Sequence, residues 1–113
     1  LFVPVAERYG LAVHVDHWVV SHTFEFFANN PQALDQLDMV SINLSGASIS
    51  DENTPQFIVS ELDRCKLKGD KFCFEFTETA AIANVDAARI LSHELRRFGF
   101  SFALDDFGTG MAS

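Results

Sequence analysis

The chain has 113 residues, of which 48% are hydrophobic and 21% are charged, as in an ordinary globular domain or part of one. Its 8 basic and 16 acidic residues give a formal net charge of −8, which argues against a protein that binds DNA or RNA polymers through a basic face. There is no apolar stretch of the roughly 18–20 residues that span a bilayer. No charged region followed by an apolar one opens the sequence, so we expect no secretory signal. With two cysteines, too few for a disulfide framework, we expect a cytoplasmic location.

A helical pattern comes first in the chain. The residues that share one face of residues 12–29 recur at mostly three- and four-residue steps, and they are Val13, Asp16, His17, Val20, Phe24 and Phe27. Asn29-Asn30-Pro31 is expected to end this helix, since proline interrupts the helical hydrogen bonds. We expect Trp18 to lie in the core.

Three later runs alternate between apolar and small or polar residues, which predicts strands near residues 39–44, 72–76 and 100–105. The apolar faces of these runs are formed by Val40, Ile42 and Leu44, by Phe72, Phe74 and Phe76, and by Phe100, Phe102 and Leu104. Helices are predicted between the strands. Thr54-Pro55 resembles an N-cap followed by the first helical residue, Asn84 or Asp86 is expected to cap a later helix, and Gly99 stands where a C-cap glycine is expected.

This order predicts successive strand–helix units with parallel strands, which build either an open doubly wound sheet or a closed barrel of eight units. Asn43, Glu75 and Asp105 end the three strands on the non-aliphatic face and are 32 and 30 residues apart. Sites in parallel α/β proteins are built at this edge. An amide and two carboxylates suit Mg²⁺, Mn²⁺ or Ca²⁺, and Asp106 is placed to bridge to a second ion. The structural alternative is that these residues are strand-end caps or interior polar groups whose hydrogen bonds are satisfied.

The string Asp105-Asp106-Phe107-Gly108-Thr109-Gly110 is the most specific in the chain. It is not a kinase motif, because no glycine-rich loop, strand lysine or His-Arg-Asp loop accompanies it, and it lacks the Lys-Ser/Thr of a phosphate-binding loop. A loop that carries metal-binding carboxylates fits better. Glu78 is either a support for that loop or an exposed capping carboxylate. The four histidines are expected to have packing or surface roles, and the cysteines lack the neighbours of a nucleophile.

Taken together, several strings resemble the EAL domain family in order and spacing over essentially the whole chain. They are Phe2–Leu11, Asp16–Val20, Asn43–Ser45, Glu75–Glu78 and Asp105–Gly110. The family consists of bacterial cyclic di-GMP phosphodiesterases built on a (β/α)₈ barrel in which one strand is reversed. The resemblance implies an α/β fold in which residues 1–113 form about three units of a TIM-type barrel.

The resemblance also implies roles for particular residues. Asn43, Glu75 and Asp105 match metal ligands, Asp106 matches the aspartate that takes part in binding a second ion, and Glu78 matches the glutamate that steadies the following loop. Gly108, Thr109 and Gly110 belong to that loop, in which Met111 and Ala112 replace the usual tyrosine and serine. The implied catalytic residues are therefore Asp105, Asp106 and Glu78. The implied reaction is hydrolysis of cyclic di-GMP to linear pGpG with Mg²⁺ or Mn²⁺, in a two-metal site.

The resemblance further implies that residues 1–113 are a partial domain. In the family, a Glu-Ala-Leu signature comes before the position that corresponds to Leu1. A Lys-Ile-Asp strand comes after the position that corresponds to Ser113. We therefore expect residues 1–113 alone to be inactive and to form a homo-oligomer or a strand-exchanged assembly. The sequence leaves open whether the parent protein carries GGDEF, PAS or membrane segments. A membrane segment would tether it to the inner membrane. Two alternatives remain: a degenerate EAL domain that binds cyclic di-GMP or a protein without catalysis, and a purely structural assembly.

Overall fold

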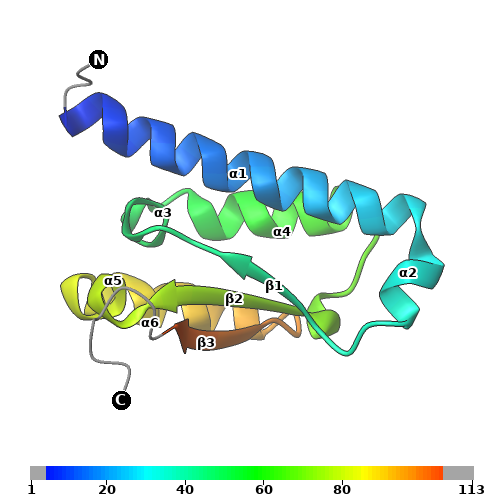
Figure 1. Ribbon diagram of the computed structural model, residues 1–113. Helices are drawn as coiled ribbons and strands as arrows, with labels where there is room; N and C mark the ends of the chain where they lie inside the picture. Colours follow the sequence, from blue (N-terminus) through cyan, green and yellow to red (C-terminus); the bar gives the residue numbers. More distant parts are fainter. Residues whose placement is uncertain (1–4, 106–113) are drawn as a thin grey trace.

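The computed structural model describes residues 5–105, which form a three-stranded sheet with helices packed on it (Figure 1). Strands β1 (Val40–Asn43), β2 (Phe72–Thr77) and β3 (Ser101–Asp105) lie in the order β1-β2-β3. Both pairings are parallel, which confirms the prediction from the alternating runs. Each strand lies within one residue of its predicted position.

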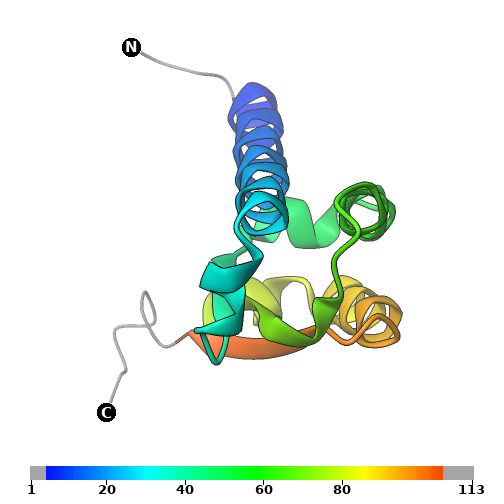
Figure 2. The same ribbon diagram turned by 90° about the vertical axis from the view of Figure 1, so that its right-hand side faces the viewer.

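Helices connect the strands and cover one face of the sheet (Figures 1 and 2). Their bounds are α1 (Val5–Asn29), α2 (Pro31–Asp35), α3 (Gly46–Ser50), α4 (Thr54–Arg64), the 3₁₀ turn η1 (Gly69–Lys71), α5 (Glu78–Ala83) and α6 (Val85–Arg96). The other face of the sheet carries none of these helices. Over the part of the chain from Val5 to Asp105, no helix is both long and apolar enough to cross a membrane.

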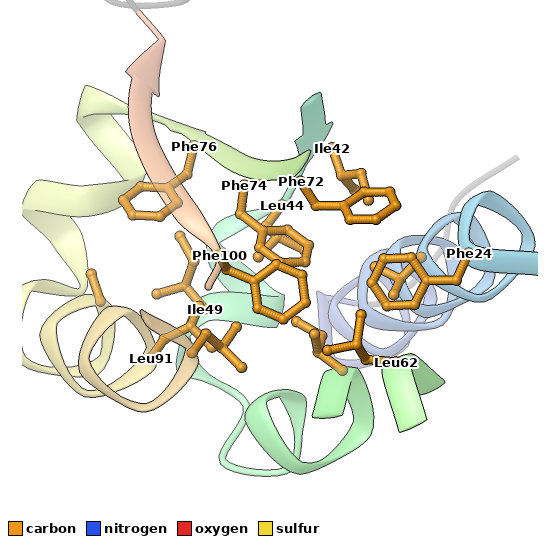
Figure 3. Packing of buried hydrophobic residues seen from close by; sticks show 14 of the residues in the cluster. Phe24, Ile42, Leu44, Ile49, Leu62, Phe72, Phe74, Phe76, Leu91 and Phe100 are labelled. Atoms are coloured by element: carbon orange, nitrogen blue, oxygen red, sulfur yellow. The ribbon is translucent and has the colours of Figure 1, made fainter. Parts of the chain in front are cut away.

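The core lies between the sheet and the helices (Figure 3). Phe72 and Phe74 of β2 are fully buried, and the Phe24 ring of α1 meets the Phe72 ring edge-on at 5.0 Å between centroids. Phe100 packs against Phe74 at 5.1 Å. Burying a phenylalanine is worth about 1.5–3 kcal/mol. Because these rings come from α1, from β2 and from the residue just before β3, the core ties α1 and β3 to the central strand.

The structure corrects several details of the expected helices. Helix α1 extends seven residues further toward the N-terminus than the predicted range of 12–29. Thr54 is the first residue of α4 rather than its cap, and its hydroxyl oxygen lies 3.3 Å from Nε2 of His17 instead of bonding to the helix backbone. The cap position is Asn53, which makes no side-chain cap bond. Trp18 is 55% exposed and stacks on His22, so the expectation of a core residue was wrong.

Two helices end in a left-handed residue, a conformation that favours glycine. Gly99 follows α6 with φ +96°, which confirms its expected place beyond the helix end. After α4 this position is held by Lys66, with φ +57°. The Leu67 N–H donates to the Leu62 carbonyl at 3.1 Å, and the Lys66 N–H donates to the Asp63 carbonyl at 3.0 Å. These two bonds form a Schellman motif in which a side-chain-bearing residue occupies the glycine position.

Replacing Lys66 with glycine is expected to stabilise the fold by about 0.5–1 kcal/mol. The left-handed conformation costs an L-residue about 1–2 kcal/mol, of which the greater unfolded-state freedom of glycine offsets a part. Urea unfolding of the full-length protein measures the change. Lys68→Gly is the matched control, because it removes the same charge at an extended position with φ −103°. That control is expected to destabilise the protein, and equal shifts of the same sign in both variants would contradict the cap argument.

Candidate functional site at the carboxyl ends of the strands

The strand register brings the predicted site residues to one face of the sheet. Asn43 of β1 lies level with Glu75 of β2. Glu75 lies level in turn with Ala103 of β3, and Asp105 lies level with Thr77, two residues further along. Because side chains alternate along a strand, Asn43, Glu75 and Asp105 all lie on the face opposite the phenylalanines. The structure therefore brings all three oxygen-bearing residues to one edge, in a stepped rather than a level arrangement.

Small side chains form the floor beneath these oxygen donors. Ser41, Cys73 and Ser101 lie level with one another one pleat earlier in the three strands. Burial raises the pKa of the Cys73 thiol, and the nearby negative charge of Glu75 raises that pKa further. The thiol is therefore held protonated, which agrees with its exclusion as a nucleophile. Ala103, level with Glu75, also has a small side chain.

The loop after β1 is tied down on both sides. The Leu44 N–H donates to the Glu75 carbonyl at 2.8 Å, which extends the pairing of β1 with β2 beyond Asn43. On the other side, Asp16 of α1 accepts from the Ser45 N–H at 2.8 Å and from the Ser45 hydroxyl at 2.7 Å, and Oδ2 of the same carboxylate also accepts from the Ser48 hydroxyl.

Asp16 lies on the apolar face of the first helix in the sequence pattern, which by itself predicted no role for this carboxylate. A carboxylate at such a position needs a partner, and that was the signal for a buried polar contact. His17, on the same face, has the packing role expected of the histidines. Its ring stacks on Phe57 with 4.1 Å between centroids.

Glu78 follows β2 and does not belong to a strand. It is the exposed first residue of α5, whose N-terminus is capped by the Thr77 hydroxyl, the acceptor of a 3.0 Å bond from the Ala80 N–H. Glu78 borders a hollow of about 430 Å³ on the helix side of β3, where Leu104 and Ile82 are exposed. Asp106, Gly108, Thr109 and Gly110 lie outside the described residues, as does the loop that Glu78 was expected to support.

The donor set at the strand ends is suited to a hard cation. It consists of the exposed Asn43 amide and the half-buried carboxylates of Glu75 and Asp105. Between residues 5 and 105 no three His, Cys, Asp or Glu side chains gather closely enough to hold a metal ion by themselves. Two carboxylates and an amide are the oxygen ligands that Mg²⁺ and Mn²⁺ accept, so the residues present fit such an ion.

Comparison with known proteins agrees with this arrangement. The family model of the EAL domain matches residues 1–113. The chain is 38% identical over 112 residues to the cyclic di-GMP phosphodiesterase PdeF of Escherichia coli and 40% identical over 112 residues to the cyclic di-GMP phosphodiesterase PdeB of Shewanella oneidensis. Each alignment covers 99% of this chain but only 15% of PdeF and 13% of PdeB. The chain thus spans a small part of the curated relatives that it matches.

Solved structures of EAL domains have the same fold. The PaMucR phosphodiesterase, solved in complex with c-di-GMP, superposes with a TM-score of 0.79 at 28% identity, over 99% of this chain and 48% of that one. BlrP1 of Klebsiella pneumoniae, solved as a manganese/cy-diGMP complex, gives a TM-score of 0.67 at 24% identity, over 98% of this chain and 27% of that one. The three parallel strands with their helices are therefore part of a TIM-type barrel, and the chain belongs to the EAL domain family.

Proposed function

We propose that this chain is part of an EAL domain that hydrolyses one phosphodiester bond of cyclic di-GMP to give linear pGpG. The observation that carries the proposal is the strand register, which brings Asn43, Glu75 and Asp105 to one face at the carboxyl ends of parallel strands. The relatives at 38% and 40% identity are named as phosphodiesterases of this nucleotide, which supports the same reaction here.

In this proposal, Asn43, Glu75 and Asp105 hold a Mg²⁺ or Mn²⁺ ion, and Asp106 takes part in holding a second. Divalent ions in such a site supply charge stabilisation for phosphodiester cleavage and lower the pKa of bound water. Related EAL structures with manganese and calcium support the use of a divalent ion. Glu78 is proposed to support the loop that contains Gly108, Thr109 and Gly110, and so to act on the site through loop geometry.

The charge of the chain gives a physical reason for the metal ions. Cyclic di-GMP carries two phosphates, while the proposed site carries carboxylates in a chain of formal net charge −8. Like charges at the strand ends would repel the nucleotide unless cations lay between them. A cation held by Glu75 and Asp105 removes this repulsion and supplies the positive charge that the acidic chain lacks.

A degenerate EAL domain that binds the nucleotide without cleaving it is the less favoured function. Degeneration would be expected to remove oxygen ligands, yet Asn43, Glu75, Asp105 and Asp106 are all present. The cytoplasmic location, self-association and neighbouring GGDEF, PAS or membrane segments remain proposals about the parent protein.

Removal of divalent ions is expected to abolish hydrolysis by the full-length protein. Excess EDTA should stop the conversion of cyclic di-GMP to pGpG, measured by chromatography, and Mg²⁺ or Mn²⁺ should restore it. Ca²⁺ is expected to restore little activity, because its looser coordination orients the attacking water less strictly. Undiminished turnover in excess EDTA would contradict the proposed metal site.

Replacing Glu75 and Glu78 in turn separates a metal ligand from a loop support. Glu75→Gln in the full-length protein is expected to lower Mn²⁺ affinity and to reduce turnover by about 10²–10³-fold or more. Glu78→Gln should retain Mn²⁺ affinity while still lowering turnover, because support of a loop changes geometry rather than the ligand set. Titration calorimetry with Mn²⁺ measures the affinities, and equal losses in both variants would refute this division of roles.

A polypeptide of residues 1–113 alone is expected to show only background hydrolysis and to associate. It holds Asn43, Glu75, Asp105 and Asp106 for two ions, without the family's Glu-Ala-Leu glutamate or Lys-Ile-Asp lysine. Leu104 at the β3 edge is 56% exposed, and within residues 5–105 both outer strands pair on one side only. Light scattering and chromatographic turnover assays test both parts. A monodisperse monomer with metal-dependent turnover would overturn them.

A further inference from the structure

The Asp16 carboxylate makes more bonds to the loop after β1 than helix packing requires. Its Oδ2 atom accepts from the backbone N–H of Ser45 and from the hydroxyls of Ser45 and Ser48. Ser48 is completely buried, and Asp16 is half-buried against it. Hydrogen bonds to an ionised acceptor are about twice as strong as neutral ones, so this is a firm attachment of the loop to α1.

This attachment acts two residues away from Asn43. The backbone is fixed at Leu44 by its 2.8 Å bond to the Glu75 carbonyl and at Ser45 by Asp16. Asn43 itself is exposed, and within residues 5–105 its side chain makes no hydrogen bond. Its direction is therefore set by the backbone, and the backbone immediately after Asn43 is held by β2 on one side and by Asp16 on the other.

A role as a simple helix cap does not account for Asp16. The Ser45 hydroxyl already caps α3, accepting from the Ser48 N–H at 3.2 Å. A serine cap of this kind serves a short helix without help from a carboxylate. What Asp16 adds is a link from the loop to α1, an element that is otherwise held by the core through Phe24 and Val20.

We propose that Asp16 is a positioning residue that fixes the Asn43 amide for metal binding through the Ser45 and Ser48 contacts. This inference rests on the proposed function, because it takes Asn43 as a metal ligand. It predicts that the Asp16 carboxylate affects metal affinity and turnover without touching the ion or the nucleotide. Groups that orient metal ligands from behind typically contribute about 10–100-fold in affinity or activity.

The test measures Mn²⁺ affinity by titration calorimetry, kcat and KM for cyclic di-GMP, and thermal unfolding of the full-length protein. Asp16→Asn is expected to weaken Mn²⁺ binding by about tenfold or more, and Ser48→Ala is expected to weaken it by less. At limiting Mn²⁺ kcat should fall, and saturating Mn²⁺ should restore most of it, because the Asn43 amide is still present. KM for the nucleotide at saturating Mn²⁺ should change little.

Two control variants separate positioning from stability and from charge. Leu62→Ala removes a buried side chain of α4 outside the cluster and is expected to lower the unfolding midpoint without weakening Mn²⁺ binding. Asp63→Asn removes one exposed carboxylate of α4 and is expected to change neither quantity. If Leu62→Ala weakens Mn²⁺ binding as much as Asp16→Asn does, Asp16 acts only through stability and the proposal is wrong.

A third variant distinguishes failure of this inference from failure of the proposed function. Asn43→Ala is expected to weaken Mn²⁺ binding at least as much as Asp16→Asn. If Asn43→Ala weakens binding while Asp16→Asn leaves it unchanged, the positioning role is refuted and the metal site stands. If Asn43→Ala also leaves binding unchanged, Asn43 is not a ligand, and the ligand assignment falls together with the inference.

Discussion

The pairing of β2 with strands on both sides is the constraint on which the rest of the structure depends. Phe72, Phe74 and Phe76 of this strand are buried under the helices, so the period of two directs Cys73 and Glu75 to the opposite face. A slip of one residue would expose three phenylalanines and bury a carboxylate among apolar side chains. The free energy of burying the rings thus also determines on which face the candidate site is built.

Helix α1 contributes to both the core and the candidate site. Phe24, on its C-terminal half, packs on Phe72, and Asp16, about two turns earlier, binds the loop that follows Asn43. A helix anchored by aromatic packing is a rigid support, and a carboxylate on such a support fixes the backbone it binds. The orientation proposed for Asn43 therefore depends on hydrophobic contacts made well away from the strand ends.

The candidate site concentrates negative charge at the carboxyl ends of the strands. Glu75 and Asp105 are half-buried, and along β1–β3 the level beneath them consists of the small side chains of Ser41, Cys73 and Ser101. In the proposed function these carboxylates hold cations, because an anionic nucleotide approaches carboxylates only across cations. Acidic composition and phosphate chemistry are compatible for that reason.

The sequence by itself predicted three parallel strands and an edge bearing Asn43, Glu75 and Asp105, because strand periodicity and polar strand ends are local signals. It predicted Gly99 beyond a helix end for the same reason. It did not predict Lys66 in a left-handed cap, the exposure of Trp18, or the Thr54 contact with His17. Nor did it give the two-residue offset of Asp105 or the link from Asp16 to Ser45. Register and side-chain partners join residues far apart in the chain, so only tertiary packing, which decides which surfaces meet, could determine them.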